Sequence, residues 1–402
     1  MHNLESVVRK HFAYCKAREW SGIDPYDALN SKLLTKLPVL DSRLPRIVLT
    51  QALRRSPLNI RPLLQIGKTQ NPKALACFLK AFLKLRAAGM AGQEADIEYM
   101  LQRLAALRSK DMPYSCWGYS FPWQTRTVLV RQFAPNLVCT AFVAGALLDA
   151  YEQGQDSRCL EMAVSAADYI IDELYWTDGE SCAGFAYPLP TQRQRIPNAN
   201  FLASALLSRV YRYTGDKEYL EPALRAARYS ATRQRADGGW DYGEARPQRW
   251  IDNFHTGYNL CALRDIGRYA ETNEFADRIR HGLEFYKAHF FRQDGAVGYF
   301  HDRTFPIDSH CVAQSILTLL ALRDLDAGNV PLARSVFSWA MEHLWDDRGF
   351  FYYRKLRFCT IRTSYMRWTQ AWMFSALAAL WEAEANANPC GNSTWQIPQH
   401  TY

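Results

Sequence analysis

The chain has 402 residues, of which 48% are apolar and 22% are charged, a composition typical of a globular protein and unlike a disordered or fibrous one. Its formal net charge is +8, but Lys and Arg form only short clusters such as Arg54-Arg55, which argues against a nucleic-acid-binding arm. No apolar run reaches the roughly 18 residues that a membrane span needs, so no span is expected.

Cysteine usage and the start of the chain bear on the compartment. The ten cysteines are scattered from Cys15 to Cys390 without a Cys-x-x-Cys pair, a pattern typical of reduced, buried thiols rather than of disulfides or a zinc site. Residues Met1 to Trp20 are charged throughout and lack the apolar stretch of a secretory signal. Motifs for nucleotides, dinucleotides and catalytic zinc are missing. We therefore expect a cytoplasmic protein without a metal or other cofactor.

The predicted elements begin with an amphipathic helix in Leu4–Trp20. Residues 30–70 contain several prolines and mixed polarity, and are expected to be the least regular segment. Lys73–Leu85 then has the apolar spacing of a buried helix, and Gln93–Arg108 has the one-sided spacing of a half-exposed partner. This order of a buried helix followed by a half-exposed one is the unit that the rest of the chain repeats.

The repeat has a measurable step. Ile251-Asp252 and Ile307-Asp308 are 56 residues apart, and so are Gln314 and Gln370. Repeats of such length are typical of arrays in which each unit buries its face on the next. Inner helices are expected near residues 73, 136, 198, 253, 308 and 364, and outer helices near 4, 93, 156, 217, 274 and 330.

Six inner and six outer helices predict an all-α fold, an (α/α)6 toroid that forms a single domain over residues 1–402 with a tail at 386–402. An open helical solenoid is the alternative. Closure is favoured because the terminal copies are no more polar than the middle ones, whereas an open array needs polar caps. Extended segments are short, and pieces such as 349–353 are expected to form small β-hairpins in the connections.

In such a ring the starts of the inner helices and the outer-to-inner connections line a central funnel. Trp117, Tyr187 and Trp240 lie in these connections beside polar residues, and Asn198 lies at an inner-helix start. Aromatic faces can stack on a sugar ring while polar groups bind its hydroxyls, so we predict that these four residues bind substrate. The alternative is that Gly and Asp form turns while the rings plug the helix layer.

The sharpest pattern is Asp252 with His255, followed one repeat later by Asp308 with His310. Residues three apart share a helix face, so the carboxylate of Asp252 can hold the imidazole of His255 as a general base. We predict that all four are catalytic. The alternative is that each aspartate caps a helix N-terminus, and a cap can also point into a funnel.

Two further clusters complete the predicted site. Asp24 and Asp27 surround an Asp-Pro helix start, where they serve either as caps or as a substrate-binding group and a catalytic acid. At the last inner-helix start, Tyr365, Arg367 and Trp368 are predicted to bind substrate, with Arg367 suited to clamp a uronate carboxylate. The alternative for the last cluster is surface charge beside a core tryptophan.

Four segments together resemble the VpsJ-type polysaccharide biosynthesis proteins. These are Trp20–Asn30, Trp117-Gly118-Tyr119, Asp237–Gly243 and Trp250–Tyr258. The resemblance covers most of the chain and implies an (α/α)6 toroid tied to bacterial exopolysaccharide synthesis, with no catalytic residue assigned. Asp-Gly-Gly-Trp at 237–240 also echoes the terpene-cyclase toroids, but their acidic protonation motif is missing.

The leading hypothesis is therefore an enzyme that cleaves or modifies a glycan, as a glycoside hydrolase, a polysaccharide lyase or a uronyl epimerase. Its expected partners are an oligo- or polysaccharide, acidic ones included, and the polysaccharide synthesis machinery, with no nucleic acid. The first alternative is a non-catalytic glycan-binding or scaffold component of a synthase complex. The second is an isoprenoid cyclase, with aromatic residues around an apolar cavity.

Overall fold

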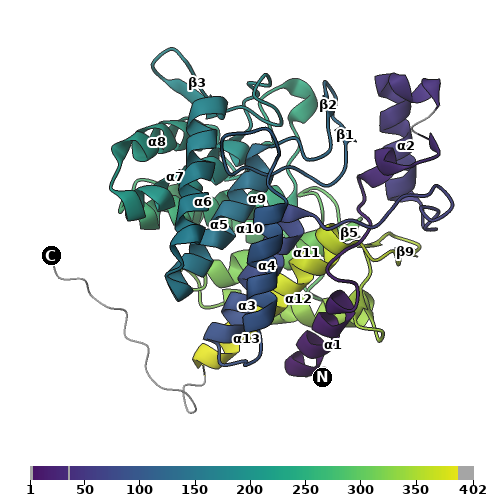
Figure 1. Cartoon of the computed structure of the whole chain (residues 1–402). Coiled ribbons are helices and arrows are strands. Elements are labelled where there is room, and N and C mark those ends of the chain that lie inside the picture. Colours follow the sequence, from purple (N-terminus) through teal and green to yellow (C-terminus); the bar gives the residue numbers. More distant parts are fainter. Residues whose placement is uncertain (1–2, 35–36, 388–402) are drawn as a thin grey trace.

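In the computed structural model, which describes residues 3–34 and 37–387, inner and outer helices alternate along the chain (Figure 1). The inner helices are α3 (Pro72–Ala87), α5 (Leu137–Gly154), α7 (Pro197–Thr214), α9 (Asn253–Tyr269), α11 (Ser309–Ala321) and α13 (Ala371–Ala387). The outer helices are α1 (Leu4–Lys16), α4 (Glu94–Ala106), α6 (Ser157–Tyr169), α8 (Lys217–Ala231), α10 (Ala276–Phe290) and α12 (Asn329–His343). These elements match the predicted positions.

The inner helices form a closed ring. Each packs on the next, from α3 through α5, α7, α9 and α11 to α13, and α13 packs back on α3. The outer helices cover this ring one by one, and α1, from the start of the chain, covers α13 at its end. The predicted (α/α)6 toroid is confirmed, and the open solenoid is wrong.

Local sequence explains where the inner helices begin. Asn71, Asn136, Asp252 and Asp308 each accept a hydrogen bond from a backbone N–H in the first turn of α3, α5, α9 and α11. Such caps satisfy donors that the helix itself leaves free. Four of the six inner helices therefore present a carboxylate or amide at the same end, and α7 begins instead with Pro197 at its first position.

Short antiparallel strands occur only in the connections of the described ranges. They are β1 (Trp123–Gln124) with β2 (Leu129–Val130), β3 (Tyr175–Asp178) with β4 (Cys182–Phe185), β6 (Trp345–Asp346) with β7 (Phe350–Phe351), and a three-stranded set of β5 (Ile307–Asp308), β8 (Arg354–Lys355) and β9 (Thr360–Ile361). The hairpin predicted at 349–353 is present as part of β6–β7.

One helix lies outside the two layers. Within residues 30–70, α2 (Arg43–Arg55) forms a regular helix that stands at the margin of the molecule beside β1 and β2 (Figure 1). Its inward side contributes Leu53 to a small separate core with Ala28 and Ile66. Most of the predicted tail at 386–402 lies outside the described residues. Within the described part, no helix combines the length and apolarity that crossing a membrane requires.

Candidate functional site

Asp252 and His255 form the pair that their spacing predicts. Asp252 caps α9 by accepting from the His255 backbone N–H at 3.0 Å, and the same carboxylate contacts His255 Nδ1 at 2.8 Å. Trp250 Nε1 donates to the carboxylate at 3.2 Å, and Tyr242 stacks on Trp250 with ring centroids 4.6 Å apart. The two interpretations of Asp252, as a helix cap and as the partner of a histidine, are therefore both correct.

His255 keeps an open side. Its side chain is 23% exposed, whereas that of Asp252 is 2% exposed. Among the described residues, His255 Nε2 has no hydrogen-bond partner. A carboxylate on Nδ1 fixes the tautomer that leaves the Nε2 lone pair available, and this is the arrangement of a general base.

Phe254 packs against both His255 and His310. The ring centroid of Phe254 is 4.1 Å from that of His255 and 4.8 Å from that of His310. His310 Nε2 is 2.6 Å from the Tyr258 hydroxyl, and Nδ1 has no partner in the described structure. Burial, with Lys73 nearby, holds the pKa of His310 well below its usual range, so this imidazole is neutral.

Lys73 places a buried amine at the centre of the ring. Its Nζ lies 4.0 Å from the ring centroid of Phe142 and 5.3 Å from those of Tyr258 and Trp372. Within the described residues, no carboxylate pairs with this Nζ. Burial, and then the charge of Arg367, lower the pKa of Lys73 to about 7. The amine therefore gains or loses a proton near neutral pH.

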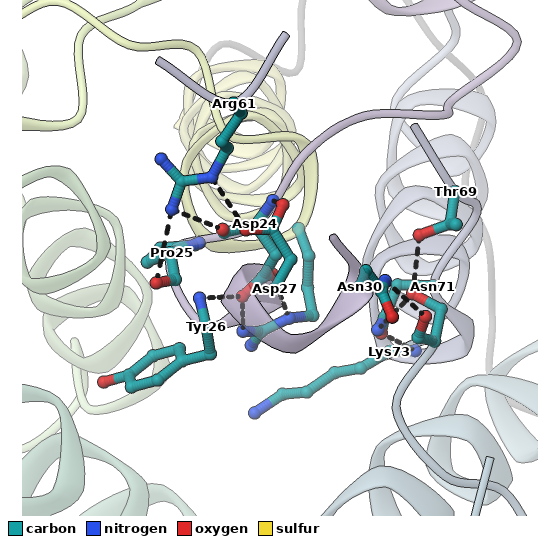
Figure 2. Close-up of polar contacts among 11 residues, drawn as sticks. Asp24, Pro25, Tyr26, Asp27, Asn30, Arg61, Thr69, Asn71 and Lys73 are labelled. Carbon is teal, nitrogen blue, oxygen red and sulfur yellow. Dashed lines mark hydrogen bonds and ion pairs between the residues drawn. The ribbon is translucent and has the colours of Figure 1, made fainter. Parts of the chain in front are cut away.

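Asp24 and Asp27 both form buried ion pairs. Arg367 binds Asp24 through two hydrogen bonds of 2.7 and 2.8 Å, and Arg61 binds Asp27 at 2.7 Å. Asp27 also accepts from the Asp24 backbone N–H at 2.8 Å. Figure 2 shows the two aspartates side by side with Arg61, and no dashed line joins the Lys73 side chain to either carboxylate. The predicted acid Asp27 is thus already paired.

Asp308 is occupied in the same way. Arg354 donates to it at 2.6 and 3.0 Å, Trp368 Nε1 donates at 2.8 Å, and it caps α11. Its side chain is fully buried. The repeat at 308–310 therefore differs from that at 252–255. Asp308 binds the guanidinium of Arg354, whereas Asp252 binds the imidazole of His255.

Several tyrosines lie near these groups. Burial raises the pKa values of Tyr187, Tyr242 and Tyr299, and the nearby phenol of Tyr26 adds to each shift. Tyr26 also packs on Trp368, with ring centroids 5.4 Å apart. The predicted binding residues Tyr187 and Trp368 are therefore brought to the centre.

The guanidinium of Arg367 lies 5.0 Å from the ring of Tyr119, so this predicted binding residue also reaches the centre. α2 adds a second guanidinium that was not predicted. Arg54 donates to the Tyr353 hydroxyl at 3.1 Å and lies 4.9 Å from the ring of Tyr26. The central space thus has cationic groups from three separate parts of the chain.

Four predicted binding residues lie elsewhere. Trp117 and Trp240 are buried in the helix layer, where their indole N–H groups donate to the carbonyls of Leu104 and Ser230. Their loops carry the same Gly and aromatic pattern as a binding loop, but both rings lie in the core. Asn198 donates to Asn259, 3.3 Å away, and Tyr365 is fully buried beside Arg61.

Several central residues were not predicted. They are Tyr26, Arg54, Lys73, Tyr119, Tyr242, Trp250 and Tyr258. Lys73 carried a usable signal, because it is a charged residue in the first turn of a helix whose next six residues are apolar. Arg54 carried none, because its place depends on how α2 folds back over the ring.

Among the described residues, no group of three or more His, Cys, Asp and Glu side chains could hold a metal ion. A small cavity of about 10 Å³ lies beside Asp24 and Arg367, which is room for a single water molecule.

Comparison of the sequence with known protein families and with curated proteins gives no match. The structure is similar to solved structures of sugar-processing enzymes. A cellobiose 2-epimerase from Bacillus thermoamylovorans is 11% identical, with 80% of this chain and 90% of that one covered and a TM-score of 0.62. A GH76 alpha-mannanase from Bacteroides thetaiotaomicron is 14% identical, with 79% and 86% covered and a TM-score of 0.58.

An unsaturated glucuronyl hydrolase from Streptococcus agalactiae is 10% identical, with 94% of this chain and 91% of that one covered and a TM-score of 0.59. At such identities these similarities establish the fold alone. They show that the (α/α)6 toroid of this chain is shared with enzymes that act on sugars.

Proposed function

We propose that this protein is a carbohydrate-modifying enzyme in which His255 moves a proton to or from a sugar at the centre of the ring. The observation that carries this proposal is the Asp252–His255 pair, with Nδ1 held at 2.8 Å and Nε2 without a partner in the described structure. The enzymes that share the fold, among them an epimerase and a mannanase, support a sugar as the substrate.

Proton transfer fits this centre better than hydrolysis by two carboxylates. Glycoside hydrolysis needs one carboxylic acid and one carboxylate free to meet the substrate. Asp24, Asp27 and Asp308 are each bonded to an arginine, and Asp252 is bonded to His255 and Trp250. We therefore favour the epimerase or lyase type of reaction over the hydrolase type.

In the proposed reaction, Asp252 orients His255 and stabilises the imidazolium that forms when Nε2 takes a proton. The proton comes from a carbon next to a carbonyl or carboxyl group, where the charge left behind can spread onto oxygen. Lys73, whose pKa is about 7, is the group that can return a proton near neutral pH. Tyr258, bonded to His310, is placed to bind a hydroxyl of the sugar.

An acidic sugar suits the charges at the centre. Lys73 and Arg54 supply cationic groups there that no carboxylate of the described residues pairs, and a guanidinium binds carboxylates well. A uronate residue of a polysaccharide or its precursor meets this requirement. Together with the resemblance to VpsJ-type proteins, this supports a role in bacterial exopolysaccharide synthesis in the cytoplasm.

The test is a screen of purified protein against neutral and acidic oligosaccharides, with analysis for epimerised sugars, unsaturated uronates and new reducing ends. On the substrate that is turned over, His255→Gln and Asp252→Asn are expected to lower kcat by about 10²–10⁴-fold, the usual contribution of a general base. His281→Gln is the matched control, because His281 is exposed on α10. Full turnover in both site variants would show that the assignment is wrong.

A non-catalytic glycan-binding role is the second candidate, and the tyrosines around the central space favour it. In that case Trp368→Ala would abolish glycan binding, while His255→Gln would leave both binding and the cellular function intact. The same panel of variants, measured by calorimetric titration with each glycan, separates the two functions.

A further inference from the structure

The outward side of the α2 segment is apolar, which is unusual for a surface helix. Of the 11 large hydrophobic side chains that are exposed in the described structure, eight lie between Leu33 and Leu63. On α2 itself, Leu44 and Val48 are both 65% exposed and lie one turn apart. Exposed apolar residues gathered in this way mark an interaction surface, because a soluble surface scatters them.

The same segment carries most of the net charge of the protein. Residues 32–68 contain eight Lys and Arg and a single acidic residue, so their net charge is +7, against +8 for the whole chain. Arg43, Arg55 and Lys32 are exposed there. Exposed leucines among basic side chains, with Asp41 as the single acidic residue, are the pattern of helices that lie in the headgroup region of an anionic membrane.

We propose that the α2 segment, residues 32–68, docks this protein on an anionic lipid surface. Its apolar side chains, led by Leu44 and Val48, would enter the boundary between headgroups and acyl chains. Its exposed basic side chains, including Lys32, Arg43 and Arg55, would contact the acidic headgroups. Leu53 and the buried Arg61–Asp27 pair anchor the inward side of the segment to the rest of the protein. The exposed apolar residues therefore remain on its outward side.

Charge favours a membrane over a second copy of the chain. Two such segments would bring together a net charge of +7 each, and like charges across an interface oppose association. An anionic bilayer supplies the opposite charge over a wide area. The proposal goes beyond the proposed reaction, because it concerns where the protein works. Since Arg54 of α2 reaches Tyr26 and Tyr353, docking would also place the central site near the lipid surface.

The experiment is co-sedimentation of the full chain with vesicles of phosphatidylcholine alone or with about a third phosphatidylglycerol. We expect binding to the anionic vesicles that weakens as salt rises. Lys32→Gln with Arg55→Gln should weaken binding by roughly 30-fold, at about a tenfold change per 1.4 kcal/mol and 1 kcal/mol per basic residue. Leu44→Ser with Val48→Ser should weaken it by about tenfold or more.

Two variants serve as matched controls. Leu325→Ser removes an exposed leucine, and Lys217→Gln removes an exposed basic residue, both outside the segment. Neither should change binding. Equal affinity for both kinds of vesicle, or unchanged binding after Leu44→Ser with Val48→Ser, would overturn the proposal. A dimer in sedimentation velocity that dissociates in that double variant would overturn it in favour of self-association. None of these readouts depends on catalytic activity.

Discussion

At the scale of single residues, one carboxylate combines a structural and a chemical task. Asp252 starts α9 by accepting the His255 backbone N–H, and it holds the ring of the same histidine. Asp308 has the same place in the next unit, but Arg354 and Trp368 occupy it, and His310 turns to Tyr258 instead. Two equal positions in a repeat have thus taken different roles.

Lys73 makes stability depend on pH in a predictable direction. Burial, and then Arg367, lower its pKa to about 7 in the folded protein, from 10.5 for a free lysine. Between these values the unfolded chain binds a proton that the folded chain does not, so the folded state gains stability as pH rises. From about pH 7 to about pH 9 the gain from this residue is about 2 kcal/mol.

Lys73→Met should remove this part of the pH dependence. We measure the free energy of unfolding of both proteins by urea titration at pH 7 and pH 9. From pH 7 to pH 9, the wild type should gain about 2 kcal/mol relative to the variant. A difference between the two proteins that stays constant with pH would mean that the amine is charged in the folded state.

At the scale of elements, a buried ion pair fastens the chain that follows α2 to residues 24–27, which precede α2. Arg61 and Asp27 are 1% and 3% exposed, and Arg61 also donates to the backbone carbonyl of Asp24 at 3.1 Å. Arg61→Met would leave a buried carboxylate without its partner, which costs about 3–5 kcal/mol of the free energy of unfolding.

The control for this variant is Arg348→Met. Arg348 binds Asp346 at 2.8 Å with similar geometry, but its side chain is 74% exposed, so the loss should stay below about 1 kcal/mol. Adding Asp27→Asn to Arg61→Met should restore part of the stability. If Arg61→Met unfolds at the wild-type urea concentration, the buried pair does not hold the segment.

Gly118 marks a close approach between two connections. A Cβ at this position would lie 2.0 Å from the Ala134 carbonyl oxygen, so the backbone beside Tyr119 would have to move. Gly118→Ala is expected to cost at least about 1–3 kcal/mol in urea unfolding. Gly154→Ala is the control, because nothing lies within 4 Å of the added Cβ, and it should change stability by less than about 1 kcal/mol. Equal stability of the two variants would contradict the close approach.

At the scale of the whole molecule, stability depends on the closing of the ring. α1 covers α13 with Val7 and Val8, and His11 Nδ1 and Nε2 contact the carbonyls of Gly349 and Gln370 at 2.9 and 3.0 Å. The first and last helices of the ring are therefore joined by packing, and polar contacts of α1 support the joint. We expect the ring to unfold as one unit when this joint is broken.

Val8→Asp places a charge in this joint without a partner. We expect a loss of at least about 3 kcal/mol and a lower urea midpoint over the whole transition. Lys10→Asp, at an exposed position of the same helix, should leave the midpoint close to that of the wild type. A variant Val8→Asp in which only α1 detaches, while the rest unfolds as before, would argue against closure as the source of stability.

The repeat made the architecture predictable, because helix spacing and Asn or Asp caps are local signals. The contact between Asp252 and His255 was predictable for the same reason, because residues three positions apart at a helix start lie on the same face. The burial of Trp117 was not predictable, because a tryptophan that packs in a core and one that binds a sugar can have the same local sequence. Arg54 and Tyr26 depend on how the segment before the ring folds over its centre, which no local pattern encodes.

The central claim is that His255 moves a proton on a sugar carbon, and turnover in D₂O tests it most directly. With the substrate found by the oligosaccharide screen, we predict one of two results: deuterium enters a C–H position of an epimerised product at the rate of turnover, or a lyase reaction gives an unsaturated uronate. His255→Gln should abolish either result, while His281→Gln should not. New reducing ends without deuterium on carbon, at a rate unchanged in His255→Gln, would contradict the claim.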